Sequence, residues 1–179
     1  MDIKKIKNYQ IFSIIFTFIL GTLLHFTYQL SGENYIVAMF SSINESVWEH
    51  LKLLYFPMLL TIIMGCFYFE KNFPNFICSK TVGIIISIMF LIIFNYTYTG
   101  IIGKNIPIID ISSFFIAVIL GEYIAYLLVI NNFKCNSKIS ILFLIILLIC
   151  FIVFTYFTPD LGIFRDPIIG KIGMKKRGY

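Results

Sequence analysis

Five long apolar runs, separated by short polar connections, constrain the fold of this chain more than any other feature. Each run is close to the roughly 20 residues that an α-helix needs to cross the hydrocarbon core of a bilayer. The runs are continuously apolar, whereas the strands of a membrane β-barrel alternate in units of about 10 residues. The sequence therefore predicts an all-α, polytopic membrane helix bundle with five transmembrane helices, at residues 9–30, 51–69, 81–100, 111–130 and 139–157.

Composition supports this fold class and excludes two others. Hydrophobic residues make up 59% of the chain and charged residues 13%, against roughly 45–50% and about 25% in a typical soluble domain. Such hydrophobicity also excludes a disordered chain. The first apolar run follows a basic segment, as in a signal peptide, but at about 22 residues it exceeds the roughly 7–15 apolar residues of such peptides. We expect one integral membrane domain over residues 1–179, whose tail, residues 158–179, is ordered or flexible.

The distribution of lysine and arginine predicts the orientation, because cytoplasmic loops carry the excess of these residues. The chain is expected at the cell membrane with a cytoplasmic N-terminus. Because the number of spans is odd, the C-terminal tail is then predicted to be extracytoplasmic. The basic residues of that tail count against this assignment. The predicted cytoplasmic residues are Lys4, Lys5, Lys7, Lys71, Lys80, Lys134 and Lys138, the outer ones are Lys52 and Lys104, and the tail carries Arg165, Lys171, Lys175, Lys176 and Arg177.

The net charge of +5 lies largely in this tail. Basic residues so close to a bilayer suit anionic lipid headgroups, and no nucleic-acid-binding motif is present. The four cysteines show no metal-ligand or disulfide spacing. Two fall inside spans, and Cys78 and Cys135 fall in loops assigned to the reducing cytoplasm. We therefore expect the cysteines to be structural or incidental.

Polar residues inside or beside membrane spans are costly and point to function. Most of those in this chain gather at the outer ends of the predicted spans. His25 lies five residues before the end of the first span, less than about 10 Å from the surface at 1.5 Å per residue. A candidate site is therefore expected in the outer leaflet, near His25, Glu49, His50, Lys52, residues 95–99, Asp110, Asp160, Arg165 and Asp166.

The segment 42–52 holds the densest group of these residues. If it is helical, Glu45, Glu49 and Lys52 share one face at positions i, i+4 and i+7, and His50 points elsewhere. An alternative for Glu45 is a capping box, because Ser42 stands three residues before it. The single tryptophan of this segment is predicted to be an interfacial anchor.

His25, Glu49 and His50 are the candidate metal ligands, because a histidine inside an apolar helix needs a partner and the chain has only two histidines. Imidazole and carboxylate ligands suit zinc and iron. The spacing matches no strong metal motif, so an ordinary surface pair of Glu49 with Lys52 remains an alternative. The candidate catalytic residues are Glu45, Glu49, Lys52 and Asp166, the last from a Pro- and Gly-rich tail that can fold back over the outer face.

Three further features bear on the bundle. Pro57 removes a backbone donor and is expected to kink the second span near Leu53, leaving a carbonyl free. Glu122 stands alone deep in the fourth span, as a neutral hydrogen-bonded acid or as a proton or cation relay. The apolar segment 35–40 is too short to span and is predicted to be re-entrant or to lie on the surface.

The run Asn44-Glu45-Ser46-x-Trp48-Glu49-His50-Leu51-Lys52, with Phe164-Arg165-Asp166-Pro167-x-x-Gly170 near the end, resembles a family of small uncharacterised multi-pass bacterial membrane proteins. The resemblance covers nearly the whole chain. It implies a membrane location and supplies no activity that can be transferred.

Three functions follow as hypotheses. The first is a metal-dependent or acid/base hydrolase that acts on a lipid or lipid-linked substrate in the outer leaflet, with Lys52 or Arg165 holding an anionic headgroup. The second is a proton- or cation-coupled transporter or channel that uses Glu122, and the third is a non-catalytic membrane subunit. Homo-oligomers are compatible with each.

Overall fold

The computed structural model describes residues 3–69, 73–170 and 172–173. These described residues form six α-helices and one short 3-10 helix, which confirms the all-α prediction. Five charges that entered the orientation count lie outside the described residues: Lys71, Lys171, Lys175, Lys176 and Arg177. The elements are α1 (Ile3–Leu30), α2 (Tyr35–Ala38), α3 (Val47–Phe69), α4 (Phe76–Ile102), α5 (Pro107–Ile130), α6 (Ser137–Tyr156) and η1 (Gly162–Phe164).

Five of these helices are long and apolar enough to cross a membrane, so the predicted number of spans is confirmed. Each begins two to six residues before its predicted start. The earlier starts add polar residues or proline to most of these first turns, where the first amides of a helix have no partner within the helix. Pro107 begins α5, and Asn136 caps α6 by accepting a hydrogen bond from the Lys138 amide.

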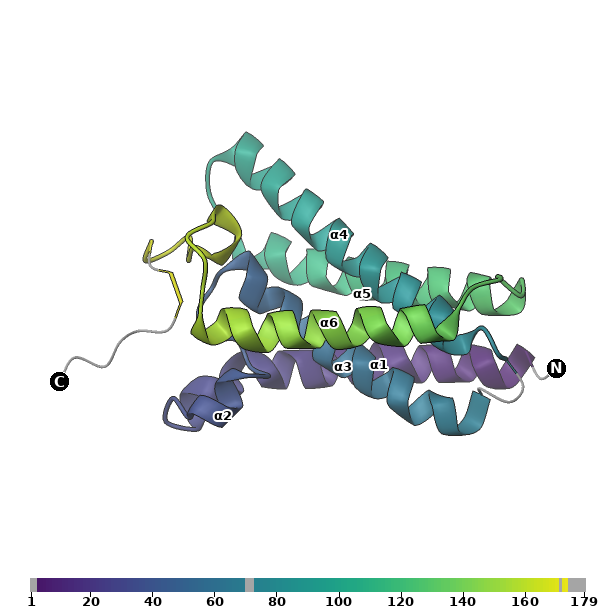
Figure 1. Ribbon diagram of the computed structural model, residues 1–179. Helices are drawn as coiled ribbons and strands as arrows, with labels where there is room; N and C mark the ends of the chain where they lie inside the picture. Colours follow the sequence, from purple (N-terminus) through teal and green to yellow (C-terminus); the bar gives the residue numbers. More distant parts are fainter. Residues whose placement is uncertain (1–2, 70–72, 171, 174–179) are drawn as a thin grey trace.

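The long helices lie side by side and leave their connections at two opposite ends of the bundle (Figure 1). One end, here called the α2 end, gathers α2, the α4–α5 connection and the C-terminal segment. The opposite end holds the N-terminus and the α3–α4 and α5–α6 connections. As expected, the segment 35–40 does not span: its helix α2 has four residues, and Tyr35 and Ile36 expose their side chains.

The core of the bundle is built around α3, α4 and α5, while α1 and α6 expose many large apolar side chains, as lipid-facing helices do. Tyr55 of α3 is fully buried, and its hydroxyl donates to the Leu144 carbonyl of α6 at 2.6 Å. Pro57 lies inside α3 and has no amide hydrogen to donate to the Leu53 carbonyl. This oxygen faces α1, where a Cβ on Gly21 would lie 2.7 Å from it.

Helices α4 and α5 cross with their backbones in contact at two glycines. A Cβ on Gly83 would lie 2.6 Å from the Gly121 carbonyl oxygen, and a Cβ on Gly121 would lie 2.5 Å from the Gly83 carbonyl oxygen. Small residues allow such close approach between membrane helices. Ser87 donates to the Ala117 carbonyl at 2.8 Å beside this crossing, so the two helices are fixed against one another.

This crossing corrects the prediction that Glu122 stands alone. The Lys80 Nζ lies 2.7 and 2.5 Å from the two Glu122 carboxylate oxygens, and both side chains are buried. Lys80 also donates to Gln10 Oε1 and Ser13 Oγ of α1, at 3.1 and 3.2 Å. The prediction was wrong because α4 begins at Phe76 rather than at residue 81, which moves Lys80 from a loop into the bundle.

The cysteine prediction is also corrected. Cys78, near the start of α4, and Cys135, in the α5–α6 connection, form a disulfide. They are 57 residues apart in sequence, so no local motif reveals the pair. The disulfide lies at the end of the bundle that the charge rule assigns to the cytoplasm, where disulfides are rare.

Candidate metal centre

Three potential metal ligands from three segments of the chain meet at the α2 end. His25 comes from α1, Glu45 from the connection between α2 and α3, and His50 from the first turn of α3. The His25 Nε2 lies 3.7 Å from one Glu45 carboxylate oxygen and the His50 Nε2 lies 3.4 Å from the other. One ligand atom of each residue lies within 4.8 Å of the other two. The expected meeting of His25 and His50 is confirmed, with ring centroids 5.4 Å apart.

A backbone hydrogen bond fixes the ring of His50. Its Nδ1 lies 2.9 Å from the carbonyl oxygen of Ser46, and because a carbonyl only accepts, this nitrogen carries the proton and donates. In the neutral ring the other nitrogen, Nε2, then has a free lone pair. Nε2 is the nitrogen nearest Glu45, so a neutral His50 ring offers this nitrogen as a metal ligand.

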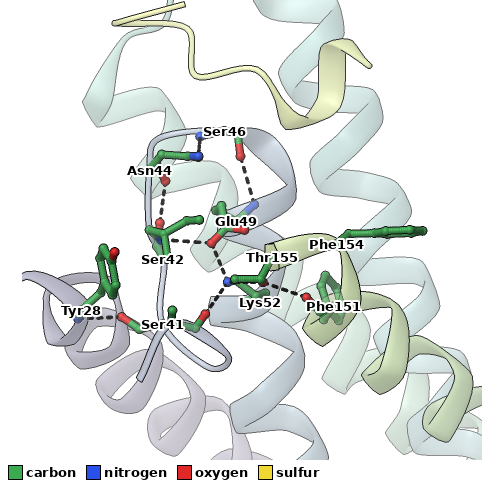
Figure 2. Close-up of polar contacts among 12 residues, drawn as sticks. Tyr28, Ser41, Ser42, Asn44, Ser46, Glu49, Lys52, Phe151, Phe154 and Thr155 are labelled. Carbon is green, nitrogen blue, oxygen red and sulfur yellow. Dashed lines mark hydrogen bonds and ion pairs between the residues drawn. The ribbon is translucent and has the colours of Figure 1, made fainter. Parts of the chain in front are cut away.

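Glu45 lies before α3 rather than within it, which corrects the helical reading of segment 42–52. The predicted capping box of Ser42 and Glu45 does not form; Ser42 Oγ donates to the Asn44 carbonyl instead. Helix α3 begins at Val47, and Ser46 Oγ accepts from the Glu49 amide at 3.4 Å (Figure 2). Ser46 and Glu49 have the same spacing, so the sequence contains a second capping-box pattern four residues after the first.

Glu49 and Lys52 form a buried ion pair of 2.5 Å instead of joining the two histidines (Figure 2). Lys52 also donates to the Ala38 carbonyl at 2.9 Å and to Thr155 Oγ1 at 3.0 Å. The Glu49 carboxylate accepts from the Ile43 amide at 3.0 Å. These bonds tie α2, α3 and α6 together and use all three N–H groups of the Lys52 ammonium. Glu49 and Lys52 thus hold the connection that carries Glu45.

The C-terminal segment folds back over the α2 end, as the sequence suggested. Phe164 is buried against Trp48, with ring centroids 4.9 Å apart. Trp48 also packs on Phe151 and Phe154 of α6, with ring centroids 4.7 and 5.6 Å apart. Its ring therefore joins α3 to α6 and to the C-terminal segment. The aromatic cluster places residues 164–166 beside the start of α3.

The adjacent residues Arg165 and Asp166 differ in burial and in their partners. Asp166 is buried and its Oδ2 accepts from the Glu45 amide at 3.1 Å. Arg165 is exposed and pairs with Asp160 at 3.2 Å. Asp166 therefore contacts the backbone of a candidate ligand and does not form the solvent pair with Arg165.

The side chains of a second polar cluster at the α2 end form hydrogen bonds within that cluster. Asp110 of α5 accepts from Asn95 Nδ2 at 3.2 Å and from the Tyr98 hydroxyl of α4. The Tyr98 hydroxyl accepts from the Ile106 amide at 3.3 Å. This group joins α4 to α5 and supplies no residue to the His25, Glu45 and His50 group.

No curated protein and no solved structure matches this chain. One family model matches residues 1–174, a region that includes all five long helices, the three potential ligands and the folded tail. This agrees with the expected resemblance, over nearly the whole chain, to an uncharacterised family. The chain belongs to DUF6512, a family of unknown function.

Proposed function

We propose that this protein is a membrane-embedded, metal-dependent hydrolase whose metal ion is held by His25, Glu45 and His50. The main support is the hydrogen bond that His50 Nδ1 donates to the Ser46 carbonyl. This bond leaves Nε2 free to bind a metal beside a carboxylate. Metal-binding histidines almost always donate their other nitrogen in this way. The proposal replaces Glu49 with Glu45 among the ligands expected from sequence, because Glu49 is engaged by Lys52.

The spacing and exposure of the three side chains fit a catalytic zinc site. Ligands about 2.0–2.1 Å from a tetrahedral ion lie about 3.4 Å from one another. The two histidine–Glu45 distances, 3.7 and 3.4 Å to different carboxylate oxygens, are close to this value, and one ligand atom of each of the three residues lies within 4.8 Å of the other two. Three protein ligands leave a fourth position for water or substrate, as in catalytic rather than structural sites. His25, His50 and Glu45 remain 28%, 34% and 40% exposed, so water and substrate have access. Iron accepts the same ligands.

Such an ion would lower the pKa of a bound water to about 7 and so supply hydroxide. Held by His25, Glu45 and His50, the ion would thus serve hydrolysis of an ester carbonyl or phosphoryl group: hydroxide would add to the carbon or phosphorus, the bond to the leaving oxygen would break, and that oxygen would take up a proton equivalent to the one that the water released to solvent. His25 lies five residues from the end of α1, about 8 Å along the helix axis. A lipid or lipid-linked molecule, whose reactive group lies near the headgroup level, suits that depth.

The other candidate residues take supporting roles in this proposal. Lys52 is fully buried and has three acceptors, so it is not proposed to hold an anionic headgroup. Arg165, which is 57% exposed, is available for that role. A transport function through Glu122 receives less support, because Lys80 neutralises that carboxylate.

Metal binding by the purified full chain tests the proposal. Elemental mass spectrometry and a zinc titration should show one zinc or iron per chain. His25→Ala, His50→Ala and Glu45→Gln should each weaken binding, so that at zinc concentrations that saturate the wild type they hold well under one ion per chain. Glu33→Gln, an exposed carboxylate in the same half of the chain, should bind as the wild type does. Zinc-loaded protein should then cleave ester or phosphodiester lipids in vesicles, and the three ligand variants should not. Absence of metal from every preparation, including zinc-reconstituted protein, would overturn the proposal.

A further inference from the structure

The segment that follows α6 is folded and docked, although its sequence is rich in proline and glycine. It contains the 3-10 helix η1, and an antiparallel bridge joins Arg165 to Ile172. The Gly170 amide donates to the Asp166 carbonyl at 2.9 Å and closes the turn between them. Phe164 is 4% exposed and fixes this turn against Trp48. The carboxylate of Asp166 is thus held in one place next to the start of α3.

Asp166 is a buried carboxylate that accepts hydrogen bonds from three backbone amides. Its Oδ1 accepts from Ile168 and Ile169, at 2.8 and 3.1 Å, and its Oδ2 accepts from Glu45 at 3.1 Å. Among the described residues it forms no ion pair. The turn that follows Asp166 orients one oxygen, and the other oxygen is left for an amide 121 residues away.

Glu45 is the one proposed ligand that does not lie on a helix. His25 and His50 are held by α1 and α3, whereas Glu45 lies in the connection between α2 and α3. Two other amides of this connection are bound by nearby side chains: Ile43 donates to Glu49 and Ser46 donates to Asn44. The Glu45 amide itself is bound by Asp166. Its position therefore depends on a residue of the distant C-terminal segment.

We propose that Asp166 is a positioning residue, which fixes Glu45 so that its carboxylate meets His25 and His50 at the metal. The inference rests on the proposed metal-dependent function and adds to it that the docked C-terminal segment completes the metal centre. Asp166 acts through the backbone of Glu45 and touches neither metal nor substrate. Outer-shell partners of this kind typically change metal affinity 10–100-fold when they are replaced.

The first test compares zinc and cobalt affinities of the full chain in micelles. Asp166→Asn retains the shape of the side chain but cannot accept from the Ile168, Ile169 and Glu45 amides with two oxygens. It should weaken binding about 10–100-fold, while Asp160→Asn, in an exposed pair of the same segment, should change it by less than about twofold. Glu45→Gln combined with Asp166→Asn should bind no more weakly than Glu45→Gln alone, because Asp166 acts only through Glu45. Additive losses in the double variant would overturn the inference.

The second test does not depend on metal. In the metal-free protein, Asp166→Asn should speed hydrogen exchange of the Glu45 amide, and Asp160→Asn should not. Unchanged exchange at Glu45 would overturn the inference even if metal affinity falls. If Asp166→Asn yields no folded protein, Asp166→Glu, which keeps the buried charge but displaces the carboxylate by one methylene, is measured in its place and should weaken zinc binding.

Failure of the inference and failure of the proposed function give different results. Tight zinc binding by the wild type that Asp166→Asn leaves unchanged would overturn the role of Asp166 and keep the metal centre. A wild type that binds neither zinc nor cobalt would overturn the metal centre, and with it the positioning role proposed for Asp166.

Discussion

Replacing Glu122 with glutamine should be among the most destabilising single changes in this chain. Lys80 Nζ lies 2.7 and 2.5 Å from the two Glu122 oxygens, and the two side chains are 1% and 0% exposed. Removing one partner of a buried ion pair typically costs about 3–5 kcal/mol, because the other charge is left without a counter-charge. Gln10 and Ser13 still accept from Lys80, which places the expected loss toward the lower end of that range.

The measurement is thermal unfolding of the purified protein in micelles. For a chain of this size, each kcal/mol lowers the midpoint by about 2–4 °C, so a loss near 3 kcal/mol in Glu122→Gln should lower it by roughly 6–12 °C. The matched control is Glu33→Gln, an exposed carboxylate, which should shift the midpoint by less than about 2 °C.

A double variant separates the ion pair from the packing of the two side chains. Lys80→Met combined with Glu122→Met removes both charges and keeps apolar chains of similar length. Hydrophobic replacement of a buried ion pair is often neutral or stabilising. The double variant should therefore be more stable than the single variants Lys80→Met and Glu122→Met. The reasoning would be refuted if Glu122→Gln behaved like Glu33→Gln, or if the double variant were less stable than both single ones.

Three further predictions follow from close contacts of the bundle. Gly121→Ala should lower the unfolding midpoint sharply, because its Cβ would meet the Gly83 carbonyl at 2.5 Å, whereas Gly100→Ala, with no atom within 4 Å, should be tolerated. Lys52→Met should cost about 3–5 kcal/mol in the same assay, because it leaves the buried Glu49 carboxylate without its counter-charge; an unchanged midpoint would contradict this. Cys135 should resist alkylation in unreduced, denatured protein and become reactive in Cys78→Ser; equal reactivity of Cys135 in both proteins would disprove the disulfide.

The amino-acid sequence by itself determined the helical membrane architecture. The length of the apolar runs predicts five spans because the thickness of a bilayer sets the length of a helix that crosses it, and the five long helices agree with this. The depth of His25 and His50 along their helices was predictable for the same reason, since rise per residue is constant. Their meeting was expected, and the ring distance of 5.4 Å bears it out.

The tertiary structure decided which polar side chains are partners. Glu45 rather than Glu49 meets the histidines because α3 begins at Val47. A sequence pattern does not fix the end of a helix to better than one or two residues. Lys80 meets Glu122 because two glycines let α4 and α5 touch. Asp166 reaches the Glu45 amide across 121 residues. Such contacts depend on helix crossings and on the docked tail, which no local periodicity encodes, whereas the spans depend only on local apolar length.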